Sequence, residues 1–321
     1  MKRIGVICGG FSSEFEISLK SATTIVQNFP TNYEPVKIIL KRGSCEALWN
    51  EQTYPIRLSE KGFQAEDNWI ELDAFLIYTH GNPGENGKIQ AIFDMYEIPY
   101  INSGALASEL SFDKWYCNQF LKGFDISIAT SKLILKGDLV DTSEIVSQLG
   151  LPLFVKPCDS GSSYGISRVN EEKNLSSAIE NAFKEGDSVV IESFLDGTEV
   201  TCGVYRNATG IHALPLAEIV SENEFFDYEA KYLGKSQEIV PARISDDLTL
   251  KVQEVAKKVY GILRLKSIAR IDFMLVNGIP HVIEVNTTPG FTEESLVPRM
   301  LKHQNKSLQD FWSEIIDFEL K

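Results

Sequence analysis

Residues 270–286 read RIDFMLVNGIPHVIEVN, a run that predicts two antiparallel strands joined by a tight turn. The segment between them, Val276-Asn277-Gly278-Ile279-Pro280, is typical of a β-hairpin turn. Residues two apart share one face of a strand. Arg270 and Asp272 therefore point one way on the first strand, and Glu284 and Asn286 point one way on the second.

The register of this hairpin decides whether the two polar pairs meet. If Asp272 lies opposite Glu284, then Arg270 lies opposite Asn286. A two-residue Asn-Gly loop would put Asp272 and Glu284 on opposite faces, because the side-chain period of a strand is two. We therefore predict a three-residue loop, Asn277–Ile279, or an equivalent bulge.

A face carrying these side chains has two possible roles. Carboxylate and amide oxygens are the ligands that Mg²⁺ prefers. Glu284 could bridge two ions, with Asp272 on one and Asn286 on the other. The alternative is a salt-bridged sheet face in which Arg270 neutralises both carboxylates. The hairpin alone leaves both open.

Further strands and helices are expected in the part of the chain before the hairpin. The first hundred residues alternate between the two, which predicts a parallel sheet with helices on both faces. The expected strands are 3–8, 34–40, 74–78, 99–102, 153–156, 166–169, 188–194, 199–205 and 211–220, and the expected helices are 18–29, 88–96, 105–111, 114–123, 175–184 and 247–260. Residues 225–236 are expected to form a long loop near a site.

Three further segments carry possible chemistry. Lys156 precedes a Gly/Ser loop through Gly165 that could cover phosphates with backbone N–H groups, although such loops are often plain hairpin turns. Gly9-Gly10 leads into a helix start with Glu14, which could bind a ligand or simply complement the helix dipole. His80 begins a turn at a strand end, where ligand crevices form, but a lone turn histidine is often a surface residue.

The overall composition excludes several classes of protein. The formal net charge is −14, which argues against nucleic acid and anionic membrane surfaces as partners. The five cysteines form no Cys-x-x-Cys pair, so a reducing cytoplasm is expected. No apolar run approaches the ~20 residues needed to span a bilayer.

Taken together and in order, the motifs resemble the D-alanine–D-alanine ligases of the ATP-grasp superfamily. The resemblance covers residues 3 to about 315 and is carried by GGFSSE (9–14), HGNPGE (80–85), KP with GSS (156–163), FDYEAKY (226–232), RID (270–272) and EVNTTPGFT (284–292). It implies an α/β chain, α+β in its C-terminal part, with three units. They are a Rossmann-like N-terminal domain (1–103), a central ATP-grasp subdomain with the phosphate loop (104–194) and a C-terminal subdomain with the metal site (195–321).

The resemblance also implies a reaction. Family members join two D-alanines at the expense of ATP, through an acyl phosphate, for peptidoglycan precursor synthesis. The expected cofactors are ATP and two Mg²⁺ or Mn²⁺, and the expected assembly is a homodimer. The alternatives are another ATP-grasp carboxylate–amine ligase, a D-alanine–D-lactate ligase, or a nucleotide-binding pseudoenzyme.

The resemblance also implies a role for individual residues of this sequence. Glu14 would hold the ammonium of the first D-alanine beside His80, and Ser162, Tyr232 and Glu14 would form one hydrogen-bonded group. Arg270 and the Gly290 N–H would stabilise the oxyanion, and Ser295 with the Leu296 N–H would bind the second carboxylate. Lys231 would reach both the transferred phosphate and the second D-alanine. The ATP-binding residues would be Lys114, Lys156, Ser162, Ser163, Glu192, Phe194, Glu199, Phe226 and Lys231, and the metal ligands Asp272, Glu284 and Asn286.

Some positions depart from the family pattern. Asn86 stands where an aspartate is usual, and Cys158 and Tyr164 are unusual in the Gly/Ser loop. Phe194 and Phe226 stand where relatives often have an aromatic residue with a polar atom, so packing against adenine is kept and a polar contact is lost. Tyr232 favours the dipeptide product over D-alanine–D-lactate, by the family pattern alone.

Overall fold

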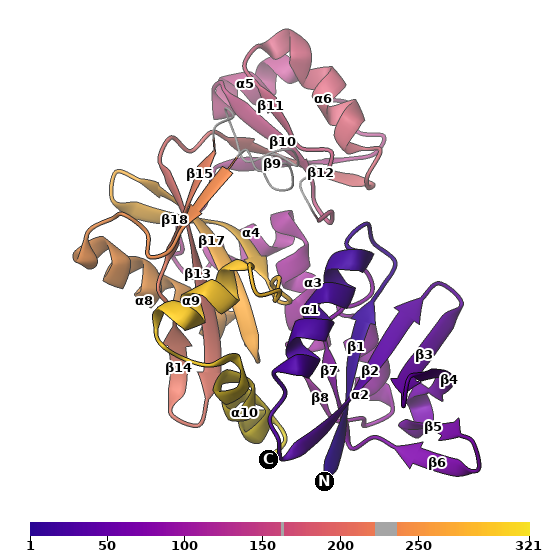
Figure 1. The fold of residues 1–321 in the computed structure, drawn as a ribbon. Helices are drawn as coiled ribbons and strands as arrows, with labels where there is room; N and C mark the ends of the chain where they lie inside the picture. The colour runs from indigo at the N-terminus through magenta and orange to yellow at the C-terminus, as the bar shows by residue number, and fades with distance from the viewer. Residues whose placement is uncertain (162–163, 222–235) are drawn as a thin grey trace.

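The computed structural model describes residues 1–161, 164–221 and 236–321. The described strands form three sheets, one after another along the chain, and helices cover their faces (Figure 1). The α/β class expected from the sequence is confirmed. No helix in the described part of the chain is both long and apolar enough to cross a membrane.

The N-terminal sheet has eight strands in the order β6-β5-β4-β3-β2-β1-β7-β8. Its parallel part matches the strands expected from alternation, with β1 between β2 and β7. An antiparallel extension, β3 to β6, was not expected. The strands are β1 (Lys2–Gly9), β2 (Tyr33–Lys41), β3 (Ser44–Trp49), β4 (Gln52–Arg57), β5 (Gly62–Ala65), β6 (Asn68–Glu71), β7 (Ala74–Ile77) and β8 (Tyr100–Ile101), and the helices are α1 (Phe15–Gln27) and α2 (Lys88–Met95).

The central sheet is antiparallel, in the order β11-β10-β12-β9. Helices α3 and α4 precede it, and α5 and α6 accompany it. Its apolar core gathers alternate residues of the strands, such as Leu153, Val155, Val189 and Ile191, under α5 and α6. The elements are α3 (Ala105–Phe112), α4 (Lys114–Lys122), β9 (Ser131–Leu135), α5 (Thr142–Leu149), β10 (Leu153–Pro157), β11 (Ser167–Val169), α6 (Leu175–Ala182) and β12 (Ser188–Ser193).

The C-terminal sheet joins six of the described strands in the order β16-β15-β13-β17-β18, with β14 also paired to β13. The single strand expected over residues 211–220 is wrong: it is two strands interrupted around Pro215, which has no N–H to donate to a ladder. The elements are β13 (Thr198–Asn207), β14 (Gly210–Ala213), β15 (Ala217–Ser221), β16 (Ser236–Ile239), α8 (Asp246–Ile262), β17 (Ile268–Val276), β18 (Ile279–Asn286), α9 (Leu296–His303) and α10 (Leu308–Glu319).

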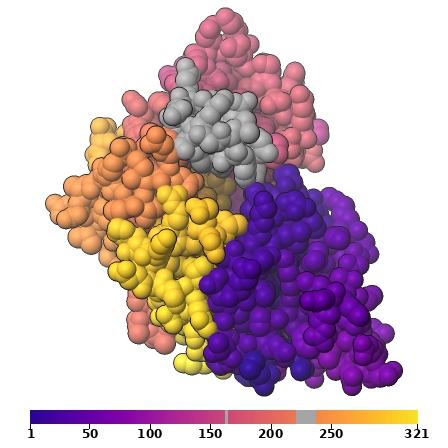
Figure 2. All heavy atoms as spheres, viewed as in Figure 1, coloured from indigo at the N-terminus to yellow at the C-terminus, as the bar shows by residue number. Residues whose placement is uncertain are grey.

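One apolar core joins the two ends of the chain. Tyr78, at the end of β7, packs edge-on against Phe291 and Trp312, with ring centroids 5.9 Å apart in both pairs. The Tyr78 hydroxyl donates to the Pro289 carbonyl at 2.8 Å. Figure 2 shows the C-terminal helices lying directly against the N-terminal part. Because the two ends share this core, the segments that follow β7 and β18 are held close together.

Candidate active site

A cavity of about 540 Å³ lies where the three sheets meet. Its wall includes Glu14 and His80 from the N-terminal part, Lys156 and Phe194 from the central sheet, and many residues of β17 and β18. Every expected site residue within the described chain lines this cavity except Glu192, which lies behind Lys156. Five further expected residues lie outside the described residues: Ser162, Ser163, Phe226, Lys231 and Tyr232.

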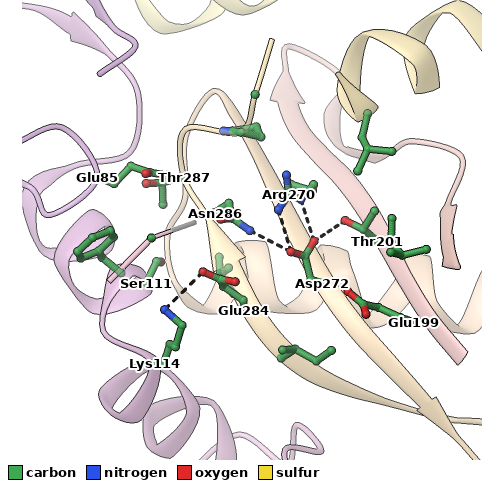
Figure 3. A pocket seen from close by; sticks show the side chains of 18 of the residues that line it. Glu85, Ser111, Lys114, Glu199, Thr201, Arg270, Asp272, Glu284, Asn286 and Thr287 are labelled. Carbon is green, nitrogen blue, oxygen red and sulfur yellow. Dashed lines mark hydrogen bonds and ion pairs between the residues drawn. The ribbon is translucent and has the colours of Figure 1, made fainter. Parts of the chain in front are cut away.

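The hairpin side chains meet on one face, as Figure 3 shows. Asp272 lies opposite Glu284, and Arg270 lies opposite Asn286. Arg270 donates two hydrogen bonds to Asp272, Nε to Oδ1 at 2.8 Å and Nη2 to Oδ2 at 2.9 Å. Asn286 Nδ2 and Thr201 Oγ1 donate to the same carboxylate, at 3.2 and 2.5 Å.

The hairpin reaches this register by the second of the two expected routes. Val276 pairs with Ile279, so the turn is the two-residue Asn277-Gly278, and the three-residue loop is wrong. Both turn residues have positive φ, 49° and 74°. The expected bulge is confirmed: Phe273 pairs with Val282 and Asp272 with Glu284, so Ile283 is the extra residue. The bulge brings Glu284 back to the face of Asp272.

The electrostatics of this face favour charged groups. Burial acts to lower the pKa of Arg270, but the charge and hydrogen bonds of Asp272, with Glu284 and Glu238 nearby, raise its pKa overall. The guanidinium is therefore always charged. In the described part of the chain, no group of three or more His, Cys, Asp or Glu side chains could hold a metal. The set Asp272, Glu284 and Asn286 supplies two carboxylates and one amide, which fits the oxygen chemistry of Mg²⁺.

Lys114 and Lys156 bring positive charge to the opposite wall. Lys114 begins α4, where Asp113 caps the helix and the Cys158 carbonyl accepts from the Lys114 N–H at 2.9 Å. Its Nζ lies 3.6 Å from Glu284 Oε1 and donates to the Ser160 carbonyl at 2.8 Å. Lys114 therefore contacts both the Gly/Ser loop and the hairpin, and Figure 3 shows its ion pair with Glu284.

Lys156 is paired with another expected residue. Its Nζ lies 2.6 Å from Glu192 Oε2, and the two side chains are only 11% and 6% exposed. Asn118 Nδ2 donates to the other Glu192 oxygen at 3.2 Å. Buried charges need partners of this kind, so a ligand that contacts this pair finds both groups already oriented.

The far end of the cavity is aromatic. Phe154 and Phe194 have ring centroids 6.1 Å apart, and the Arg168 guanidinium lies 4.8 Å from the Phe194 ring centroid. Glu199, on β13, lines the same region of the wall as Met274. Flat apolar faces beside carboxylates suit a purine and its sugar. Phe154 was not singled out from the sequence, because one aromatic residue in a strand gives no signal.

Glu14 and His80 form the N-terminal wall. Glu14 precedes α1 without capping it, and a Cβ placed on Gly161 would lie 2.7 Å from Glu14 Oε2. Only glycine lets the Gly/Ser loop approach that carboxylate so closely. His80 is buried and contacts Ser21, Nε2 to Oγ at 3.3 Å. Burial lowers the pKa of His80, despite the opposing charge of Glu14, so its imidazole is neutral at neutral pH.

Glu85 is a wall residue for which the sequence suggested no role. Its Oε2 accepts the Gly81 N–H at 2.7 Å, and it is 9% exposed. Burial raises the pKa of Glu85 to about 8, and the Glu14 carboxylate adds to this effect. The sequence did indicate that Glu85 could belong to the site, because it ends the segment that begins with the candidate residue His80.

The start of α9 forms another part of the cavity wall. Gly290, Ser295 and Leu296 all line the cavity. Ser295 Oγ accepts the Thr292 N–H at 3.0 Å, and a Cβ on Gly290 would lie 3.1 Å from that oxygen. The Ser295 side chain, at the start of α9, therefore lies beside Gly290. Helix starts of this kind favour anions.

Comparisons with known proteins agree with this geometry. The family model described as D-ala D-ala ligase N-terminus matches residues 3–103, and the D-ala D-ala ligase C-terminus model matches residues 120–317. A D-alanine–D-alanine ligase of Flavobacterium johnsoniae is 44% identical over 322 residues, with all of both chains covered. One from Parabacteroides distasonis is 41% identical, covering 100% of this chain and 98% of that protein.

Solved structures give the same result. The VanG D-Ala:D-Ser ligase of Enterococcus faecalis has a TM-score of 0.89 at 32% identity, with 98% of each chain covered. A D-alanine–D-alanine ligase of Bacillus anthracis, solved with ATP, has a TM-score of 0.81 at 30% identity, covering 100% of this chain and 98% of that one. The two family models together match most of the chain, and the relatives are similar to it along its whole length. The chain therefore belongs to the D-alanine–D-alanine ligase family.

Proposed function

We propose that the protein joins two D-alanines to D-alanyl-D-alanine at the expense of ATP, for the synthesis of peptidoglycan precursors. One observation carries the proposal. Arg270, the Asp272–Glu284–Asn286 face and two lysines line a single cavity, together with a helix start suited to a carboxylate. This set provides what phosphorylation of a carboxylate and attack by an amine require.

The reaction has two steps. A carboxylate oxygen of the first D-alanine attacks the γ-phosphorus of ATP, and ADP leaves. The amine of the second D-alanine attacks the resulting acyl phosphate carbon, loses a proton, and inorganic phosphate leaves. Arg270 and the Gly290 N–H are proposed to stabilise the oxyanion of the second step, where preorganised donors are most effective.

The ATP subsite is proposed to lie along the central sheet. Lys114 and Lys156 would contact phosphates, Glu192 and Glu199 the adenine and ribose, and Phe194 the adenine face. All of these side chains line the cavity except Glu192, which contacts the lining residue Lys156, and they extend from the hairpin to the aromatic end. The roles of Ser162, Ser163, Phe226, Lys231 and Tyr232 stay inferences from the sequence, since these residues lie outside the described chain.

The two amino acids are proposed to bind at the other end. Glu14, beside His80, would hold the ammonium of the first D-alanine. Ser295 and the Leu296 N–H, at the start of α9, would bind the carboxylate of the second. The lowered pKa of His80 supports this role for Glu14, because a charged imidazole would compete with the substrate ammonium for its carboxylate.

Asp272, Glu284 and Asn286 are proposed to hold two Mg²⁺ or Mn²⁺. These ions would neutralise charge on the phosphates of ATP. The hairpin register supports the proposal because it puts all three oxygen-bearing side chains on one face. Lys114, whose Nζ lies 3.6 Å from Glu284, provides a cation on that face.

Other parts of the proposal concern the whole chain. We take residues 1–103, 104–194 and 195–321 as the three domains, which agrees with one sheet in each. The five cysteines are free, consistent with a cytoplasmic enzyme. A homodimer is proposed from the family alone.

Coupled ADP release with D-alanine, L-alanine, D-serine and D-lactate tests the function. We expect turnover to require Mg-ATP and D-alanine, with D-alanine preferred as acceptor. D-serine belongs in the test because a similar structure is named a D-Ala:D-Ser ligase. Absence of turnover with Mg-ATP and D-alanine would end the proposal, and preference for another acceptor would make the protein a different ligase of the same family.

A further inference from the structure

Glu238 and Arg299 form an ion pair to which the proposed mechanism gives no role. Arg299 Nη1 lies 2.8 Å from Glu238 Oε2, and Arg299 Nη2 donates to the Glu238 backbone carbonyl at 2.6 Å. The guanidinium therefore grips both the side chain and the main chain of one residue. Such a two-point contact needs the planar fork of arginine, which lysine lacks.

The pair joins two elements at the acceptor end of the cavity. Glu238 lies on β16, which pairs only with β15 among the described strands. Arg299 lies one turn into α9, and its N–H donates to the Ser295 carbonyl at 3.2 Å. The edge strand is thereby fixed to the same helical turn that carries Ser295 and Leu296.

The other charges of the cavity wall indicate a role for the Glu238–Arg299 ion pair. Two other wall carboxylates have cationic partners within the wall: Asp272 with Arg270, and Glu284 with Lys114. Glu238 also lines the wall, but Arg299 is not among the lining residues of the described chain. Arg299, one turn along α9 and outside the wall, thus supplies most of the positive charge that opposes Glu238, and the wall residue Arg270 acts in the same direction.

Without Arg299, Glu238 would leave a negative charge beside the place proposed for a substrate carboxylate. We propose that Arg299 is a positioning residue for the second substrate: it orients the start of α9 through Glu238 and cancels the Glu238 charge at the acceptor subsite. The inference rests on the proposed function, since it requires a carboxylate to bind at Ser295 and Leu296. Charge cancellation predicts whether the KM for the second D-alanine rises or falls in each variant, whereas a role in packing alone does not.

The test is a double-mutant cycle on the full-length enzyme. Arg299→Met keeps an unbranched apolar stem and removes the charge, so the unpaired Glu238 should raise the KM for the second D-alanine on the order of tenfold. Adding Glu238→Gln should restore most of this loss, since no charge remains to repel the acceptor. Glu238→Gln alone leaves Arg299 unopposed and should lower that KM.

The measurement is the initial rate of ADP release over a wide range of D-alanine concentration, which resolves the constants of the two amino acid sites. The KM values for ATP and for the first D-alanine should stay within about twofold and serve as internal controls. Arg299→Lys keeps the charge but lacks the planar fork, so its KM for the second D-alanine should lie between those of wild type and Arg299→Met.

Equal losses in Arg299→Met and the double variant would overturn the proposal, because the pair would then act through packing alone. An unchanged acceptor KM in Arg299→Met would overturn it as well. If Arg299→Met does not fold, Glu238→Gln decides alone, and a raised or unchanged acceptor KM contradicts the inference. Failure of the proposed function is distinct, because wild type itself would then not turn over D-alanine.

Discussion

Arg270 combines two tasks in one side chain. It is held by two hydrogen bonds to Asp272, and it lines the same cavity as Gly290. The first task orients the guanidinium before any substrate binds, and the second puts its charge where an oxyanion would form. Donors fixed in advance stabilise a transition state without reorganisation.

We predict that Arg270→Ala lowers kcat by roughly 10²–10³, the effect of one lost oxyanion donor. The variant should also lose up to about 3 kcal/mol of stability, because Asp272 would keep a charge without its ionic partner. Steady-state ADP release and urea unfolding measure the two effects. Arg57→Ala is a matched control, since Arg57 is 67% exposed on β4. Normal turnover in Arg270→Ala would contradict its proposed role.

Glu85 makes a pH-dependent contribution to stability of unusual sign. Burial raises its pKa from 4.5 to about 8, with Glu14 and Glu284 adding to the shift and the Gly81 and Thr288 N–H groups opposing it. The folded state therefore binds this proton more tightly than the unfolded state. The resulting stability is full below pH 4.5 and is lost as the pH rises towards 8.

Glu85→Gln should remove this dependence, because a neutral amide keeps an oxygen for the Gly81 N–H. Relative to the variant, wild type should lose stability by up to about 1.4 kcal/mol per pH unit between these two values. Urea unfolding at several pH values, without nucleotide, gives the slopes. Parallel slopes for the two proteins would contradict the prediction.

At the scale of elements, the β17–β18 hairpin shows how a turn and a bulge together set a register. The Asn277-Gly278 turn, with both φ angles positive, fits the right-handed twist of the strands. That turn alone would separate Asp272 from Glu284. The extra residue Ile283 corrects the register just where the polar side chains begin.

We predict that Gly278→Ala destabilises the protein by about 1 kcal/mol and leaves kcat unchanged. No atom lies within 4 Å of a Cβ at Gly278, so the cost is the φ of 74° and no clash adds to it. Gly261→Ala, in α8, should instead stabilise by about 0.5–1 kcal/mol, since its φ is not positive and the nearest atom is 3.8 Å away. Thermal unfolding of both variants tests these opposite signs.

How much the sequence predicts differs between these elements. The hairpin and its polar face follow from period-two spacing, and the choice between loop and bulge does not, because both give the same register. The strands β3 to β6 escaped prediction because Gln52, Asn68 and other polar residues interrupt their pattern, and most residues of β4 and β6 are exposed. The Arg299–Glu238 pair joins residues 61 apart, and no local pattern encodes such a contact.

At the scale of the whole molecule, the cavity exists only while the three sheets keep their places. The shared core of Tyr78, Phe291 and Trp312 fixes the first and third sheets to each other. Lys114 and Ser160 link the central sheet to the hairpin. A ligand that fills the cavity therefore binds the folded state and has no comparable site on the unfolded chain, so it must raise stability by mass action.

We predict that ATP at about 100 times its Kd raises the free energy of unfolding by about 2.7 kcal/mol. Most of this gain should need Mg²⁺, because Asp272 and Glu284 add negative charge beside the proposed phosphate site. Thermal unfolding with ATP, with and without EDTA, measures the metal-dependent part. Glu284→Gln should lose that part while it keeps the fold, and Glu60→Gln, at an exposed position, should keep it. Equal protection by ATP in EDTA and in Mg²⁺ would mean that the 272–284–286 face holds no metal, and its carboxylates would then serve only to orient Arg270 and Lys114.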